Sequence, residues 1–263
     1  MPDQAKPSQR VPLDRLREQV RGELLPAAPN FTYFRAGQPL AEEDVRDYLE
    51  EPIAALPPAV ASHLPPVALL FVPFLEKNGH DAVVTYDAPP EDKSVLASLY
   101  RDKTGAVLTY AIDDMEVAGY HYEFYRHVAE LLFDAAGKAP RMDEYPELLK
   151  EELKSRMHGE VDDAAWQRKQ ELLQRSSAAA VKKDSKLFRD YAKQSFIDTM
   201  TLYLHGICCD IDVEPGPRQL PSPKLRRRLK LLREIFPPPK GYAVFPEELD
   251  QIEAEEARGQ RPS

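Results

Sequence analysis

The sequence predicts an α+β protein in which a small antiparallel sheet of about four strands is followed by a mainly helical half. Apolar runs rich in β-branched and aromatic residues are concentrated in residues 67–112, and helical periodicity dominates from Asp113 onward. The balance of 43% hydrophobic and 30% charged residues is typical of a folded globular chain. We therefore expect one compact unit built from three segments: a helical segment 1–66, an α+β core 67–206 and a Pro-rich, helical extension 207–263.

The overall charge disfavours several classes of partner. A net charge of -9 argues against a general nucleic-acid or anionic-membrane binder, because both need a basic face. The longest apolar run, "PPVALLFVPFL", is too short to span a bilayer, and the first residues have no signal-like apolar stretch. These features predict a cytoplasmic protein without a membrane partner.

The N-terminal segment is predicted to be helical. Leu13, Leu16, Val20 and Leu24 have the spacing of one helix face, and Pro26 is expected to end that helix. A second helix is expected from about Ala41 to Leu56, followed by a short helix or turn between two Pro pairs. Both helices are expected to form a packing layer.

Four apolar stretches predict the strands. They are "VALLFVPFLE", "DAVVTYDA", "SVLASLYRD" and "AVLTYAID", and residues 94–112 form the clearest hairpin. Charged, Gly-containing connectors separate the stretches, which favours an antiparallel meander over βαβ units.

The second half is predicted to contain several helices. Asp113 and Asp114 are expected to cap the first of them, and Gly137 to close it. "MDEYPELLKEELKSRMHG" and "DDAAWQRKQELLQRSSAAAVKK" are amphipathic and charged, as surface helices are. "SKLFRDYAKQSFIDTMTLYLHG" is apolar on most sides and ends in Gly206, which predicts a central buried helix.

A basic helix is predicted near residues 223–236. We interpret Arg226, Arg227, Arg228 and Lys230 as a solvated face that balances the acidic stretch "EELDQIEAEEAR". Binding to an acidic partner or to nucleic acid is the alternative for this helix.

The stretch "AGYHYEFYRHVAELLF" predicts a helix with two different faces. A polar stripe that includes Glu123, His127 and Glu130 is interpreted as a solvated face, with a metal site as the alternative. His121 lies on the opposite, apolar stripe, which predicts a core histidine with one hydrogen bond.

A second polar stripe lies on the predicted buried helix. Gln194, Asp198, Thr201 and His205 recur at i, i+4, i+7 and i+11 on an otherwise apolar surface. Buried polar groups need partners, so we expect this stripe to face another polar surface, with the helix around Glu123 as the natural candidate.

The windows "YEFYR" and "RDYAKQSFIDTMTLYL" resemble the gluzincin side of the zincin metallopeptidases, including bacterial peptidase domains with an HExxH helix. The resemblance implies that Glu123 matches the general base, Gln194 the third zinc ligand, and Asp198 the carboxylate that orients a ligand histidine. It also implies that Tyr122 and Arg126 replace the two histidine ligands, so the chain would be a zinc-free relative. Arg126 is then expected to pair with Glu123 or Asp198 where the metal would be.

These features predict a non-catalytic, metallopeptidase-like protein without a cofactor, which binds a peptide or protein partner rather than acting as a peptidase. The binding groove is expected to contain Tyr122, Glu123, Arg126, Gln194, Asp198 and His205. One alternative is an active metal-dependent hydrolase whose zinc is held by ligands such as His121, His127 and Glu130. A structural or interaction protein is the other alternative.

Overall fold

The computed structural model describes residues 10–37, 39–79, 81–135, 140–175, 185–208 and 218–245, and it has an α+β fold as predicted. The chain divides into two compact units: Met1–Ile53 with Leu64–His127, and Ala54–His63 with Val128–Ser263. The segment boundaries expected from the sequence stay predictions.

The first unit contains all the strands of the described ranges. They are β1 Val11–Pro12, β2 Leu25–Ala28, β3 Phe31–Arg35, β4 Val67–Val72, β5 Phe74–Asn78, β6 Asp81–Thr85, β7 Ala97–Arg101 and β8 Ala106–Ala111. Its helical segments are α1 Leu13–Gln19, η1 Val20–Gly22, α2 Glu42–Val45, the π-helix η2 Arg46–Glu50, η3 Glu91–Lys93 and η4 Ile112–Asp114. Two further helices, α3 Glu51–Ala54 and α5 Val117–Ala135, begin in this unit and end in the second.

The strands form two sheets, so the predicted single antiparallel meander is wrong. The five-stranded sheet has the order β2-β3-β4-β8-β7, with β3, β4 and β8 parallel, and the three-stranded sheet has the order β1-β6-β5. Pro73 splits the run "VALLFVPFLE" into β4 and β5, which belong to different sheets, because proline cannot donate to a continuous ladder. The predicted hairpin within residues 94–112 is confirmed as β7 and β8.

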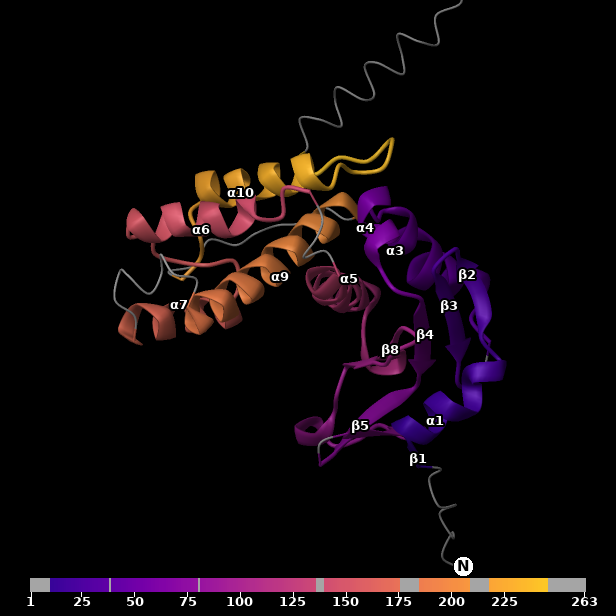
Figure 1. Ribbon diagram of the computed structural model, residues 1–263. Coiled ribbons are helices and arrows are strands. Elements are labelled where there is room, and N and C mark those ends of the chain that lie inside the picture. The colour runs from indigo at the N-terminus through magenta and orange to yellow at the C-terminus, as the bar shows by residue number, and fades with distance from the viewer. Residues whose placement is uncertain are drawn as a thin grey trace, which may run out of the picture. The chain divides into compact units, whose positions relative to one another are not determined.

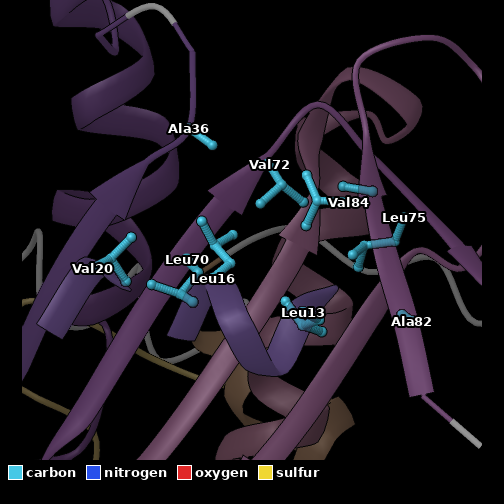
Figure 2. Close-up of a cluster of buried hydrophobic side chains, with 10 residues drawn as sticks. Leu13, Leu16, Val20, Ala36, Leu70, Val72, Leu75, Ala82 and Val84 are labelled. Atoms are coloured by element: carbon cyan, nitrogen blue, oxygen red, sulfur yellow. The ribbon is translucent and has the colours of Figure 1, made fainter. Parts of the chain in front are cut away.

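Strand β4 is almost entirely apolar because both faces of its sheet are covered. On one face, Phe71 and Tyr110 contact Tyr120 of α5, with ring centroids 5.8 and 4.9 Å apart. On the other face, Leu70 of β4 belongs to a buried cluster with Leu16 of α1 (Figure 2). The sheet is therefore the middle layer of the first unit.

The predicted N-terminal helices are found in shortened or irregular form. Leu13, Leu16 and Val20 are buried as the helical spacing predicts, but α1 and η1 end at Gly22 and the chain then forms β2 and β3. The second predicted helix is the series α2, η2 and α3. The stretch that follows Gly22 forms strands rather than helix because β3 pairs with β4.

The second unit is helical in the ranges that the structure describes. Besides the end of α5, it contains α4 Pro58–His63, α6 Glu144–Lys154, α7 Asp163–Arg175, α9 Lys186–Cys208 and α10 Ser222–Ile235. Helix α9 runs beside α6, α7 and α10 (Figure 1). Its side chains are buried along most of its length, which confirms the predicted buried helix, although it continues past Gly206 to Cys208. The expected cap Gly137 lies outside the described residues.

A buried ionic network joins the helices of the second unit. One carboxylate oxygen of Glu160 accepts hydrogen bonds from Lys169 Nζ at 2.9 Å and from Tyr191 Oη at 2.6 Å. The other oxygen accepts from Arg228 Nη1 at 2.7 Å, and Arg228 also bonds Glu152 Oε2 at 2.6 Å. The two acids and two bases balance in charge, which is what a buried ion cluster requires.

Gly159 places Glu160 in this network. Its φ is +82°, and a Cβ atom there would come within 2.2 Å of the Gln219 carbonyl oxygen. The backbone of Glu160 then bonds Arg218 O at 2.9 Å and Leu220 N at 3.0 Å. Because only glycine combines this φ with such a close approach, Gly159 fixes where the Glu160 side chain enters the core.

The prediction that the basic residues of α10 form a solvated face is wrong for Arg228. Arg226, Arg227 and Lys230 are exposed, whereas Arg228 is 0% exposed. Neighbouring residues of a helix point in directions about 100° apart, so one residue of a basic run can face the core. The acidic stretch expected to balance this helix lies outside the described residues; Arg227 instead pairs with Glu151 of α6 at 2.7 Å.

We predict that Arg228→Met destabilises the protein by about 3–5 kcal/mol, because it leaves Glu152 and Glu160 buried with less positive charge. The matched control Arg227→Met, which removes an exposed pair from the same helix, should change stability by less than about 1 kcal/mol. Urea-induced unfolding followed by circular dichroism measures both values. Equal losses in the two variants would contradict the structural role of the network.

Candidate functional site

Two groups of predicted site residues lie in different units. Glu123, Arg126 and His127 are on α5 in the first unit, and Gln194 and Asp198 are on α9 in the second. Their partners within each unit determine what chemistry each group can perform.

The polar stripe of α5 is not the solvated face that the sequence suggested. His127 is 2% exposed, because α5 packs on the five-stranded sheet and the imidazole ring contacts Tyr110 of β8. The prediction for His121 is confirmed, since it is buried and its Nε2 lies 2.7 Å from the Asp47 carbonyl oxygen. Helix α5 is therefore enclosed on more sides than its pattern indicated.

His127 is held between a tyrosine and an arginine. Its Nδ1 lies 3.0 Å from Tyr110 Oη, and its Nε2 lies 3.2 Å from Arg126 Nη2. Because a guanidinium can only donate, Nε2 must be the acceptor, and the imidazole proton belongs on Nδ1. Burial, with the positive charge of Arg126, lowers the pKa of His127 to about 3. The imidazole is thus a fixed neutral group.

Glu123 is held by the neighbouring arginine, as one of the two predicted pairings requires. Arg126 donates to Glu123 Oε2 from Nε at 2.8 Å and from Nη2 at 2.6 Å. A general base must be able to accept a proton from its substrate or from water. Both of these hydrogen bonds engage the same oxygen, so Oε2 of Glu123 is occupied by the Arg126 guanidinium.

The second group is centred on Asp198 of α9, whose buried carboxylate contacts the first turn of α7. Asp198 Oδ1 accepts from Gln194 Nε2 at 2.7 Å, and Oδ2 accepts from the Ala165 backbone N–H of α7 at 3.2 Å. Burial raises the pKa of Asp198 to about 7, and the negative charges of Asp162 and Glu160 act in the same direction. Asp198 therefore titrates in the neutral range.

The remaining predicted site residues have varied surroundings. Thr201 Oγ1 bonds the Ile197 carbonyl of its own helix at 2.8 Å, so part of the α9 stripe is satisfied locally. Tyr122, Glu130 and His205 are partly buried. The predicted groove that brings Glu123 and Arg126 to Gln194 and Asp198 stays a prediction.

The residues that the resemblance assigns to the zinc-ligand positions do not fit the metal. Zinc binds thiolate, imidazole and carboxylate donors, whereas these positions hold Tyr122, Arg126 and Gln194, of which Arg126 carries a positive charge beside Glu123. Across the described ranges, no group of three or more His, Cys, Asp or Glu side chains gathers as a metal site would need.

Sequence reasoning missed two features of the polar interior. It treated Arg228 as a surface residue and gave Glu160 and Lys169 no role, although these residues form the buried network. Lys169 shares one face of α7 with the buried Ala165 and Leu172, but its polar neighbours Arg168 and Gln170 conceal that signal. Gly159 before Glu160 was the one usable indication of a constrained backbone.

No family model, curated protein or solved structure matches this chain. None of the helices in the described ranges is long and apolar enough to cross a lipid bilayer.

We predict that the His127 ring does not titrate between about pH 5 and pH 8, because burial keeps it neutral. The measurement is the imidazole proton shift by NMR, assigned with His127→Asn. The urea-unfolded protein is the control, in which the ring should titrate near about 6.5. A midpoint above about 5 in the folded protein would contradict the geometry of the Tyr110–His127–Arg126 contact.

The raised pKa of Asp198 predicts a pH-dependent stability. The folded carboxyl keeps its proton up to about pH 7, whereas the unfolded chain loses it near about pH 4, so stability falls as pH rises between these values. Asp198→Asn removes this loss and can keep both hydrogen bonds if the Gln194 amide turns over. The variant should gain up to about 4 kcal/mol over wild type between pH 4 and pH 7.

Urea unfolding across that pH range tests this prediction. Asp190→Asn, a change of an exposed aspartate on the same helix, is the control and should show no such gain. A stability difference between wild type and Asp198→Asn that stays constant with pH contradicts the assignment.

Proposed function

We propose that this protein is a non-catalytic binding protein with a metallopeptidase-like core, and that it binds a peptide partner in an extended conformation. The observation that carries the proposal is the pair between Arg126 and Glu123 at 2.6 Å. The Arg126 guanidinium forms an ion pair with the carboxylate that would otherwise serve as general base. The site therefore favours binding over hydrolysis. The order of elements, a sheet followed by α5 and then α9, is consistent with the resemblance to zincins.

The edge strand β7 supports a peptide as the partner. Among the described strands, β7 pairs only with β8. Ala111 N donates to Leu96 O at 2.9 Å, and Asp102 N donates to Gly105 O at 3.0 Å. The backbone N–H and C=O groups of the even-numbered residues of this strand therefore point toward β8. The alternation of an antiparallel ladder then directs the N–H and C=O groups of Ala97 and Leu99 away from the sheet. An extended peptide can add to such an edge through main-chain hydrogen bonds.

The side chains of the edge favour an apolar peptide. Leu96 and Tyr100 are 44% and 42% exposed. They lie on the same face as Ser98 because alternate residues of a strand share a face. A peptide that adds to β7 would therefore place alternate apolar side chains against Leu96 and Tyr100 while its backbone completes the ladder.

The test compares two substitutions of one edge residue. Ala97→Pro removes an outward N–H without removing a bond to β8, whereas the control Ala97→Val keeps that N–H. The probe is a set of fluorescein-labelled ten-residue peptides with alternating apolar and polar residues, followed by fluorescence anisotropy. We expect Ala97→Pro to weaken binding at least about 10-fold and Ala97→Val to change it less than about 2-fold.

Two outcomes would overturn the proposal. Equal binding by Ala97→Pro and wild type, or no peptide binding below about 1 mM, would exclude strand addition at β7. Cleavage of the peptides, detected by mass spectrometry and lost in Glu123→Gln, would show that the protein is an enzyme.

A further inference from the structure

A pocket lies on the α1 side of the five-stranded sheet, on the face opposite to α5. Its volume is about 400 Å³, within the range of small-molecule sites. Ala68, Leu70 and Val107 from β4 and β8 provide an apolar floor, and Val20 and Leu24 provide an apolar wall. Val20 and Leu70 also belong to the buried hydrophobic cluster drawn in Figure 2.

Arg17 is the main polar group of the pocket. Its guanidinium lies 4.7 Å above the Tyr100 ring, and its Nη2 donates to Ser98 Oγ at 3.3 Å. Its Nε is buried without a hydrogen-bond partner. None of the described carboxylates lies within ion-pair distance of Arg17. Burial lowers the pKa of the Arg17 guanidinium, which the more distant charges of Asp81 and Asp14 only partly oppose.

A second arginine lies one helical turn further along the chain. Arg21 lines the same pocket and contacts Asp102 Oδ2 at 3.3 Å, with 68% of the Arg21 side chain exposed. The other oxygen of Asp102 already accepts from Thr104 N at 2.6 Å and Gly105 N at 3.1 Å. The exposed pair is weak, so the guanidinium of Arg21 retains donors for another anion.

A partly buried guanidinium without a counter-charge is unfavourable unless a ligand compensates for it. We propose that this pocket binds a small molecule that combines an apolar body with a carboxylate. The body lies on the floor of Ala68, Leu70 and Val107, and the carboxylate accepts charge-assisted hydrogen bonds from Arg17. Tyr100 holds the Arg17 guanidinium in place through a cation–π contact.

The two proposals concern different ligands and different protein groups: the peptide would pair with the backbone of β7, whereas the small molecule would pair with Arg17. Tyr100 belongs to both surfaces, since its ring contacts Arg17. The probes are octanoate and octan-1-ol, which share an apolar chain and differ in the charged group. Isothermal titration calorimetry at constant ionic strength should give a dissociation constant for octanoate below about 1 mM and at least about 10-fold weaker binding of octan-1-ol.

The matched variants are Arg17→Met and Arg15→Met. Both remove one positive charge from α1, but Arg15 is exposed and does not line the pocket. Arg17→Met should reduce octanoate affinity at least about 10-fold and abolish the preference over octan-1-ol, whereas Arg15→Met should bind as wild type does. Ala97→Pro should also keep octanoate binding, which separates a failure of this site from a failure of peptide binding.

Amide shifts of the wild-type protein locate the ligand without any variant. Octanoate should perturb the Ala68 and Val107 amides most strongly in a ¹H–¹⁵N spectrum. Perturbations confined to other regions, equal affinities for octanoate and octan-1-ol, equal losses in the two arginine variants, or no saturable binding would each overturn the proposal.

Discussion

A charge that is removed from water must be paired, and this constraint organises the interior of each unit. In the helical unit, Arg228 and Lys169 meet Glu152 and Glu160, which are contributed by α10, α7, α6 and the segment before α7. Burial opposes the ionisation of Glu160, but Arg228 and Lys169 outweigh it and hold the pKa of this carboxyl below its ordinary value. The rotation of each helix about its own axis is fixed because each must present one charged or polar group to this centre.

The need to pair buried charges also distinguishes polar groups that stabilise the fold from polar groups that are available to ligands. Arg126 is paired with Glu123, and His127 avoids the requirement by remaining neutral between Tyr110 and Arg126. Arg17 differs, since its guanidinium is partly buried beside an open pocket without a carboxylate partner among the described residues. A cluster whose charges are paired stabilises the fold, whereas an unpaired cation next to a cavity indicates a place for an anion.

The functional proposals use the two sides of one sheet differently. On the α5 side, Arg126 pairs with Glu123, and at the edge of the sheet the outward backbone groups of β7 are the proposed peptide site. On the α1 side, the floor of Ala68 and Val107 is apolar and the charge of Arg17 gives direction to a ligand. The apolar, doubly covered strand β4 supports both sides because it fixes the sheet between the two layers.

The sequence by itself determined the α+β class, the β7–β8 hairpin, the helix α5, the burial of α9 and the core position of His121, since local periodicity and turn residues specify these features. Only the tertiary structure decided that Pro73 separates two sheets, that β3, β4 and β8 run parallel, and that Arg228 and His127 are buried. Strand order and the pairing of distant charges depend on contacts between residues far apart in the chain. A local pattern of residue types does not contain that information, because the same polar residue can face water or a buried partner.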